Sequence, residues 1–399
     1  MLAPDALGSI IGRDHSLFAA DMQAHEDRLA STIVKSKFLV LGAAGSIGAA
    51  VTKALFRRQP KKLHAVDISE NNLVELVRDI RSSLGYIPGD FQTFALDVGA
   101  LEYDVFFQQD GDYDYILNFA ALKHVRSEAD PYTLMRLIKV NILNTEKTLK
   151  QAQAASIKNY FSVSSDKASN PVNLMGASKR AMELLLFSRA QELPITTARF
   201  ANVAFSDGSL LHSFYQRLFK RQPLVAPDDI ERYFISASEA AELCLLACLL
   251  GENRDIFFPK PSHEFHLMKF SELADRFLRL QGYEPYFCQD ETEAKEAFAS
   301  LIEKKRWPCL LSQSDTTGEK AFEEFYTGEE LLDLDRFKGI GLVKYKDNSS
   351  AAPMDWFLEA INEFRYQKKW NKKQLVELFQ ALIPNFTHIE TNHYLNDKM

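Results

Sequence analysis

The sequence lacks an excess of positive charge, a long apolar run and a leader-like start. Its 399 residues carry a net charge of -7 at pH 7, which leaves no basic footprint, so we expect no nucleic-acid partner. No run of about 18 or more apolar residues occurs, and we therefore expect no membrane span. Residues 1–30 contain no cationic stretch followed by an apolar core, so we expect a cytoplasmic protein without a signal peptide.

The sequence also lacks cysteines and histidines at the spacing that metal ligands have. The four cysteines are scattered, and Cys244 and Cys248 lie one helical turn apart in an apolar stretch, Ala241–Leu250. Such a pair is typical of a packed core rather than of a metal site. His263 and His266 occur in His-Glu-Phe-His, which lacks the spacing of a zinc protease motif. We predict no metal.

A glycine-rich turn follows the first strand-like segment. Residues 37–41 form a short apolar run, and Gly42, Gly45 and Gly48 come directly after it, where a helical pattern begins. Glycines at this spacing allow a tight turn and let the backbone approach a pyrophosphate, which the free N–H groups of the helix N-terminus bind. The sequence therefore predicts a dinucleotide site whose phosphates contact Gly42, Gly45, Ser46, Ile47 and Gly48.

Asp67 ends the next strand-like segment, nineteen residues after Gly48. A carboxylate at this place can accept hydrogen bonds from both ribose hydroxyls and would repel a 2′-phosphate, which favours NAD over NADP. Asp67 can also serve as a helix N-cap, because Ser69 and Glu70 follow it and a helix is expected from about Asn71. The two roles are compatible.

Further strand-like segments alternate with helical ones. Strands are expected at 91–96, 115–121, 160–164 and 195–200, and helices at 132–154 and 174–191. This alternation predicts an α/β fold, a Rossmann-type doubly wound parallel sheet that binds ligands at the carboxyl ends of its strands. Asp97 and Val98 follow one such end, where Asp97 can meet the adenine amine. Ala120 and Ala121 follow another, in a loop of small residues under the cofactor.

Acidic and basic side chains gather after the strand expected at 160–164. Ser165, Asp166 and Lys167 come first, and Met175 and Lys179 follow on a predicted helix. A lysine spaced like Lys179 is typical of nicotinamide-dependent short-chain dehydrogenases, in which a tyrosine precedes it by four residues. Met175 stands at that position, and a thioether cannot give or take a proton. The proton chemistry is therefore either lost or moved to Asp166 and Lys167.

With these residues in place, the chain resembles the extended short-chain dehydrogenases/reductases. More narrowly, it is similar to the nucleotide-sugar 4,6-dehydratases of bacterial polysaccharide biosynthesis. The resemblance covers residues 37 to about 245. The segments that carry it are 42–48, 67–70, 120–125, 165–167, 170–171, 175–179 and 199–203, and residues 318–320 with 323–324 resemble a late motif. Common members have tyrosine where Met175 stands, whereas an active branch has methionine in the same setting.

The resemblance implies a 4,6-dehydratase that acts on a nucleotide-sugar, with UDP-N-acetylglucosamine as the expected substrate. Hydride leaves sugar C4, water is eliminated across C5 and C6, and the hydride returns to C6, so that NAD is regenerated. Lys167 is the expected base at C5. Its pKa, roughly 10.4 for an exposed lysine, would have to be lowered by burial or by the positive charge of Lys179. Asp166, with a raised pKa, is the expected acid at C6 and can also accept the 4-hydroxyl proton.

The remaining site residues follow from the same resemblance. Ser165 is expected to bind the sugar 4-oxygen, and Lys179 the nicotinamide ribose. The expected substrate contacts are Lys123, Met175, Asn202 and Arg232, with Met175 filling space beside the nicotinamide. Plainer interpretations stand beside these roles: Lys123 and Arg232 can be solvated surface charges, and Asp166 can be a turn residue.

Four parts are expected along the chain. They are an N-terminal helical arm (1–36), an NAD-binding Rossmann domain (37–250) with a substrate loop near 203–235, a smaller C-terminal nucleotide-sugar-binding lobe (251–346) and a helical extension (347–399). Residues 347–350 are typical of a linker, and helices are expected at 290–305, 354–364 and 373–382. We assign the extension to packing or oligomerisation and expect a homo-oligomer.

Two other functions remain open from the sequence. A 4-epimerase or 4-reductase on the same fold would need a proton carrier for the 4-hydroxyl, and Met175 argues against it. A catalytically silent NAD-binding scaffold has Met175 as its support. Asp207 stands where a basic residue is common in the family, which leaves the nucleotide and the sugar open.

Overall fold

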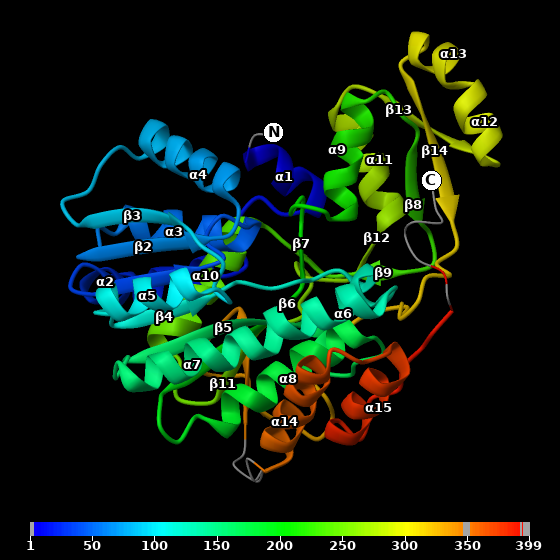
Figure 1. The fold of residues 1–399 in the computed structure, drawn as a ribbon. Coiled ribbons are helices and arrows are strands. Elements are labelled where there is room, and N and C mark those ends of the chain that lie inside the picture. The colour runs from blue at the N-terminus through cyan, green and yellow to red at the C-terminus, as the bar shows by residue number, and fades with distance from the viewer. Residues whose placement is uncertain (1–3, 346–351, 392, 394–399) are drawn as a thin grey trace.

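The computed structural model describes residues 4–345, 352–391 and 393, and its centre is a nine-stranded sheet (Figure 1). The strand order is β15-β16-β11-β6-β5-β4-β1-β2-β3. Neighbours from β3 to β11 pair in parallel, whereas β16 and β15 pair antiparallel at one edge. The strands are β1 (Lys37–Leu41), β2 (Lys62–Asp67), β3 (Asp90–Ala95), β4 (Tyr115–Asn118), β5 (Asn159–Ser165), β6 (Ile195–Phe200), β11 (Asp255–Pro259), β15 (Leu331–Asp333) and β16 (Ile340–Lys344). The predicted Rossmann-type sheet is confirmed.

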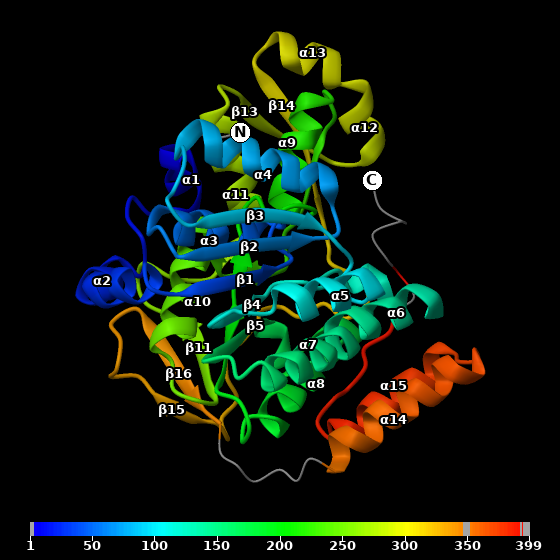
Figure 2. The same cartoon turned by 60° about the vertical axis from the view of Figure 1, so that its left-hand side comes forward.

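Helices cover both faces of this sheet (Figure 2). One face carries α2 (Ala19–Ile33), α3 (Ser46–Arg57), α4 (Glu70–Ser83) and α10 (Ala237–Leu250), and the other carries α5 (Leu101–Asp110), α6 (Pro131–Ile138), α7 (Asn144–Ala154) and α8 (Leu174–Ser188). Because both faces are covered, β5 is buried along its whole length except for Ser165. This explains why β1, KFLVL in the sequence, appears as a continuous apolar run rather than as an alternating pattern.

The helix expected at 132–154 is interrupted. It consists of α6, the π-helical turn η2 (Lys139–Leu143) and α7. The helix expected at 290–305 is also broken, because Ala297 separates α12 (Glu291–Glu296) from α13 (Phe298–Glu303). Periodicity located both helical regions but gave no sign of these local breaks.

A smaller lobe stands at one end of the sheet (Figure 1). Its three-stranded parallel sheet has the order β13-β14-β8. The elements are α9 (Leu210–Phe219), β8 (Leu224–Pro227), α11 (Phe270–Leu280), β13 (Glu284–Cys288), β14 (Arg306–Ser312), α12 and α13. Two short ladders join the lobe to the main sheet: β7 (Asn202–Val203) with β10 (Phe234–Ile235), and β9 (Glu231–Arg232) with β12 (Met268–Lys269).

The lobe does not coincide with the range 251–346 that we expected from the sequence. Strands β11, β15 and β16 lie in that range but complete the main sheet, whereas α9 and β8 precede residue 250 and belong to the lobe. A single cut in the chain therefore cannot separate the two units, because the chain crosses between them several times. The linker expected at 347–350 lies outside the described residues.

Both ends of the chain pack against this core. In the N-terminal arm, α1 (Pro4–Ile11) contributes Ile10 and Ile11 to the lobe core, and α2 contributes Leu29 and Ile33 to the sheet core. At the other end, α14 (Ala352–Gln367) and α15 (Lys372–Leu382) form the expected helical pair and lie outside α8 (Figure 2). Trp370 Nε1 donates to the carbonyl oxygen of Pro131, at 2.9 Å, and thereby ties this pair to α6.

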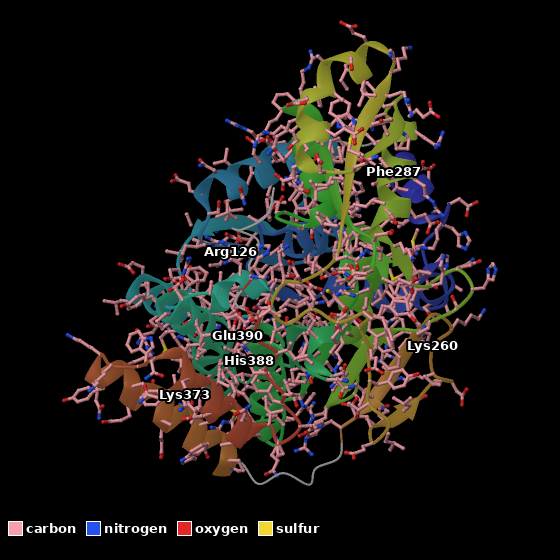
Figure 3. All side chains as sticks on the ribbon, turned by 90° about the vertical axis from the view of Figure 1, so that its right-hand side faces the viewer. Arg126, Lys260, Phe287, Lys373, His388 and Glu390 are labelled. Atoms are coloured by element: carbon pink, nitrogen blue, oxygen red, sulfur yellow. The ribbon has the colours of Figure 1, made fainter. Side chains whose placement is uncertain are left out.

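The segment after α15 returns to the carboxyl ends of the strands. Figure 3 shows His388 and Glu390 beside each other where this segment passes between the helical pair and the rest of the molecule. His388 Nε2 lies 3.0 Å from Oε2 of the fully buried Glu128, and the same oxygen accepts from the backbone N–H of Leu174, at 3.0 Å. Ile389 N–H donates to Val172 O, at 2.9 Å. The C-terminal segment therefore braces the start of α8.

If the extension is an integral part of the core, Phe357→Ala should strongly destabilise the protein. Phe357 is fully buried and its ring centroid lies 5.1 Å from that of Phe379, so truncation should lower the free energy of unfolding by about 3–5 kcal/mol. Trp356→Ala is the matched control, because this neighbouring ring is 48% exposed. Urea unfolding measures both variants, and equal losses would contradict the packing described here.

Candidate active site

The glycine turn joins β1 to α3 at the carboxyl edge of the sheet. Gly42 has φ of +72°, and a Cβ atom there would lie 2.6 Å from Ala120 N. A Cβ on Gly48 would lie 2.1 Å from Gly42 O. These two glycines are therefore required by the packing of the protein itself. Gly45 differs, because its Cβ would meet no described atom closer than 3.6 Å, and it thus leaves room for a ligand.

Two cavities meet at this turn and share Gly42 and Gly45. One, of about 280 Å³, extends from the first turn of α3, at Ser46, Ile47 and Gly48, towards β5. The other, of about 200 Å³, is lined by the remaining residues expected to bind the cofactor, which are Asp67, Asp97, Val98, Ala120 and Ala121. The N-cap residue of α3 is Gly45, which has no side chain that could cap this N-terminus. An elongated space across a helix N-terminus is the shape that a dinucleotide pyrophosphate requires.

Asp67 anchors the turn as well as lining the second cavity. Its Oδ2 accepts from Ala44 N–H, at 2.9 Å, and its Oδ1 accepts from Ser69 N–H, at 2.8 Å. The alternative that Asp67 is a helix N-cap is wrong, because Ser69 occupies the N-cap of α4 and its hydroxyl accepts from Asn72 N–H. Asp97 has a similar local role, since its Oδ1 accepts from Gly99 N–H, at 2.8 Å.

Ser165, Asp166 and Lys167 lie together at the end of β5, where a short 3-10 turn, η3 (Asp166–Ala168), begins. Ser165 Oγ donates to Asp166 Oδ1, at 2.7 Å, and the backbone N–H of Lys167 donates to the same oxygen, at 2.8 Å. Lys167 Nζ lies 3.6 Å from Asp166 Oδ1 and 3.1 Å from Glu323 Oε1. All three expected residues line the first cavity.

The pKa values of the acid, Asp166, and of the base, Lys167, are both raised. Burial raises the pKa of Asp166, because the opposing charge of Lys167 does not offset the loss of hydration. Burial alone would lower the pKa of Lys167, but the carboxylates of Asp166 and Glu323 together raise it above its ordinary value. The raised pKa of Asp166 agrees with the role of an acid, whereas Lys167 does not show the lowered pKa that a base at C5 would require.

Lys179 and Met175 face the same cavity from α8. Burial lowers the pKa of Lys179 to about 8, and its Nζ donates to the carbonyl oxygen of Val163, at 2.9 Å. Met175 is 4% exposed and lies on the cavity wall. The lysine is therefore held at the cavity beside a side chain that cannot exchange protons.

The four expected substrate contacts separate into two groups. Lys123, Met175 and Asn202 line the first cavity, and the buried Nδ2 of Asn202 has no hydrogen-bond partner among the described residues. Lys123 Nζ lies 3.4 Å from Ser206 Oγ. Arg232 does not line this cavity: it is buried and donates to Glu319 and to the carbonyl oxygens of Glu231, Lys320 and Ala321. It is thus neither a solvated surface charge nor open to a ligand in this arrangement.

A buried ionic cluster fixes α8 against β5 and β6. Arg199 is fully buried and makes paired hydrogen bonds to Glu183, at 2.9 and 2.8 Å, and to Glu330, at 2.8 and 2.7 Å. Ser164 Oγ donates to Glu183, at 2.6 Å. Burial would raise the pKa of Glu183, but Arg199 outweighs it and lowers the pKa to about 2. Because Glu183 is one turn beyond Lys179, this cluster positions the lysine.

Sequence reasoning missed several supporting residues. Asn141, in the π-helical turn η2, binds both N–H and O of Leu122 and also Ser178 Oγ, and so joins the loop after β4 to α8. Asn173 Nδ2 donates to Gly318 O, at 2.9 Å. Glu323 belongs to the late motif that the sequence showed, and that motif was the available signal. Nothing in the sequence pointed to Asn141, because hydrophobic periodicity does not predict the π-helical turn that positions it.

Two further properties concern only the described parts of the chain. Their helices include none that is long and apolar enough to cross a membrane. Across residues 4–345, 352–391 and 393, no group of three or more His, Cys, Asp or Glu side chains is arranged to hold a metal ion. Cys244 and Cys248 are buried in α10, as expected for core residues.

The sheet, the glycine turn and the lysine on α8 define a protein of the extended short-chain dehydrogenase/reductase fold. The chain belongs to the family of polysaccharide biosynthesis proteins, whose family model matches residues 38–340. The membrane protein MJ1061 of Methanocaldococcus jannaschii is 30% identical over 326 residues, which are 78% of this chain and 87% of that protein.

Two other relatives bear on function. The probable polysaccharide biosynthesis protein EpsC of Bacillus subtilis is 28% identical over 75% of this chain, which spans only 49% of EpsC. This chain therefore covers about half the length of that relative. A UDP-N-acetylglucosamine 4,6-dehydratase (inverting) of Campylobacter jejuni is 27% identical over 60% of this chain and 70% of its own.

Solved structures show the same fold. Pen from Bacillus thuringiensis superposes with a TM-score of 0.62 at 23% identity, over 79% of this chain and 89% of that one. DesIV from Streptomyces venezuelae, a dTDP-glucose 4,6-dehydratase solved with NAD and TYD bound, gives a TM-score of 0.56 at 17% identity, over 83% and 97%.

The two kinds of glycine in the turn should respond differently to alanine. Gly45→Ala introduces a methyl group into the cavity that comes no closer than 3.6 Å to a described protein atom, so NAD affinity should fall at least about tenfold while the free energy of unfolding changes by about 1 kcal/mol or less. Gly48→Ala forces a methyl group against Gly42 O and should lower the melting temperature clearly. Calorimetry and thermal unfolding measure the two effects, and identical behaviour would contradict this assignment.

Proposed function

We propose that the protein is an NAD-dependent nucleotide-sugar 4,6-dehydratase, with UDP-N-acetylglucosamine as the expected substrate. The observation that carries the proposal is the pair of the buried Asp166 and the partly buried Lys167, which lines the same cavity as the glycine turn. Elimination of water needs an acid and a base side by side. The dehydratase relative in Campylobacter jejuni and the polysaccharide biosynthesis family support this substrate class.

The described residues fit NAD. Gly45 leaves the room that a phosphate needs, and Asp67 stands at the ribose position, where its charge would repel a 2′-phosphate. Lys179 lies at the cavity and can donate to the nicotinamide ribose. When bound, NAD supplies a hydride acceptor for sugar C4 and later a hydride donor for C6. The NAD-bound neighbour DesIV supports the same cofactor class.

Each residue of the pair handles one proton. Ser165 donates to the sugar 4-oxygen, and Asp166 takes the 4-hydroxyl proton when C4 is oxidised. The 4-keto group acidifies C5–H, and Lys167 removes that proton. Asp166 then gives its proton to the departing C6 hydroxyl, which leaves as water. The raised pKa of Asp166 suits both of its steps, because it favours the protonated form of the carboxyl, which must first take up a proton and then donate it.

Lys167 separates this proposal from its alternatives. The thioether of Met175 at the cavity wall cannot carry the 4-hydroxyl proton, so a 4-epimerase or 4-reductase would also depend on Asp166, but it would leave Lys167 without a proton to move. Asp166 and Lys167 together would be superfluous in a silent scaffold, in which no proton is moved. The methionine therefore fits a branch of the family in which Asp166 has taken over from tyrosine.

The direct test is mass spectrometry of the purified protein incubated with UDP-, GDP-, CDP- and dTDP-sugars, without added NAD. We expect a product that is lighter by one water from one of these sugars, which would also show that the cofactor is retained and recycled. An isomer of unchanged mass would contradict the proposal in favour of a 4-epimerase. No conversion, even after NAD is added, would favour the silent scaffold.

Lys167→Ala should remove the base without removing the cofactor. Product formation should fall by at least about 10²–10⁴-fold, while NAD remains bound, because Lys167 does not line the cavity around Asp67. Lys150→Ala, on the exposed surface of α7, is the matched control and should keep wild-type turnover. Full turnover by Lys167→Ala would rule out this lysine as the C5 base.

A further inference from the structure

Glu323 reaches the expected base from a distant part of the chain. The loop between β14 and β15 folds back onto η3 and brings Glu323 Oε1 to 3.1 Å from Lys167 Nζ. Asp166 Oδ1 lies 3.6 Å from the same nitrogen. The amine of Lys167 is therefore bracketed by two carboxylates, one from the end of β5 and one from this loop.

The Glu323 carboxylate is buried and incompletely satisfied. The residue is 4% exposed, and its Oε2 has no hydrogen-bond partner within the described part of the chain. The other charges that face it are Lys320 Nζ, 3.8 Å from Oε2, Arg232 Nη2, 4.0 Å from Oε1, and Glu319, which is paired with Arg232. A buried carboxylate oxygen without a donor is unfavourable, so this side chain depends on the cations around it.

This geometry bears on how the base becomes active. Two neighbouring carboxylates favour the ammonium form of Lys167, whereas the amine must be neutral before it can remove a proton from carbon. We propose that Glu323 is a positioning residue that holds the Lys167 amine at the cavity, and that this amine reaches its neutral form by losing a proton to solvent. The inference rests on the proposed dehydratase function and adds a third member to the pair of Asp166 and Lys167.

The proton transfers balance over one turnover. The Lys167 ammonium first loses a proton to solvent, which leaves a neutral amine. The amine takes the C5 proton, and the C6 hydroxyl leaves with the proton that Asp166 received from the 4-hydroxyl. Lys167 then returns a proton to C5 as the hydride reaches C6. The amine is then neutral again and ready for the next turnover.

Glu323→Gln tests the proposal, because it keeps the size of the side chain and a hydrogen-bond acceptor but removes the negative charge beside Lys167. Turnover should fall about 10²-fold with little change in KM for the nucleotide-sugar, because the amine is held less firmly. A charge that favours the ammonium form is gone, so the rise of turnover with pH should occur at lower pH than in the wild type.

Glu324→Gln is the matched control, since it makes the same charge change one residue away. Glu324 Oε2 accepts a hydrogen bond from Asn170 Nδ2, at 2.9 Å, and the side chain is exposed. This variant should keep the wild-type pH profile, and Glu323→Asp, which restores a carboxylate, should recover part of the turnover. A wild-type pH profile in Glu323→Gln, a loss confined to KM, or an equal loss in Glu324→Gln would overturn the proposal.

A second measurement does not depend on turnover. The pH at which Lys167 reacts half-maximally with acetic anhydride can be read by peptide mass spectrometry of the intact chain after labelling. This midpoint pH should be lower in Glu323→Gln than in the wild type, because a charge that favours the ammonium form is gone. An unchanged midpoint would overturn the proposal. A lowered midpoint in a protein that converts no nucleotide-sugar would support the coupling of Glu323 to Lys167 and reject the proposed function.

Discussion

The parallel pairing of β1, β4 and β5 is the constraint on which the site depends. In these two ladders Leu41 lies opposite Asn118, and Asn118 lies opposite Ser162. The glycine turn, the Ala120–Ala121 loop and the Ser165–Lys167 segment therefore leave the sheet at one edge and within a few residues of the same level. Three stretches that are far apart in the sequence line one pair of cavities because their strands share direction and register.

Residues from outside these strands complete the site through buried charges. Arg199 joins Glu183 on α8 to Glu330 near β15, and Glu323 reaches Lys167 from the same side of the chain. Breaking one partner of such a buried pair leaves an uncompensated charge, which is strongly unfavourable. The late part of the chain, including the C-terminal segment that braces the start of α8, thus acts on the geometry of the catalytic pair.

Much of this could be predicted from the sequence, because it depends on local patterns. The apolar run at 37–41, the glycine spacing after it and the Asp166–Lys167 pair after a strand all lie where the sequence placed them. The pKa of Lys167 could not be predicted, because Glu323 comes from a loop whose path only the tertiary structure gives. The burial of Arg232 and the bounds of the lobe could not be predicted for the same reason. The homo-oligomer and the cytoplasmic location stay predictions.

The central claim is an internal transfer of hydride from C4 to C6 while Asp166 and Lys167 move the protons. The most direct measurement uses the nucleotide-sugar substrate labelled with deuterium at C4. The protein is incubated with it in ordinary water, and the product is analysed by NMR. The account predicts deuterium at C6 of the same molecule, next to a 4-keto group. Deuterium that remains at C4, or that is lost to water or to added NAD, would contradict it.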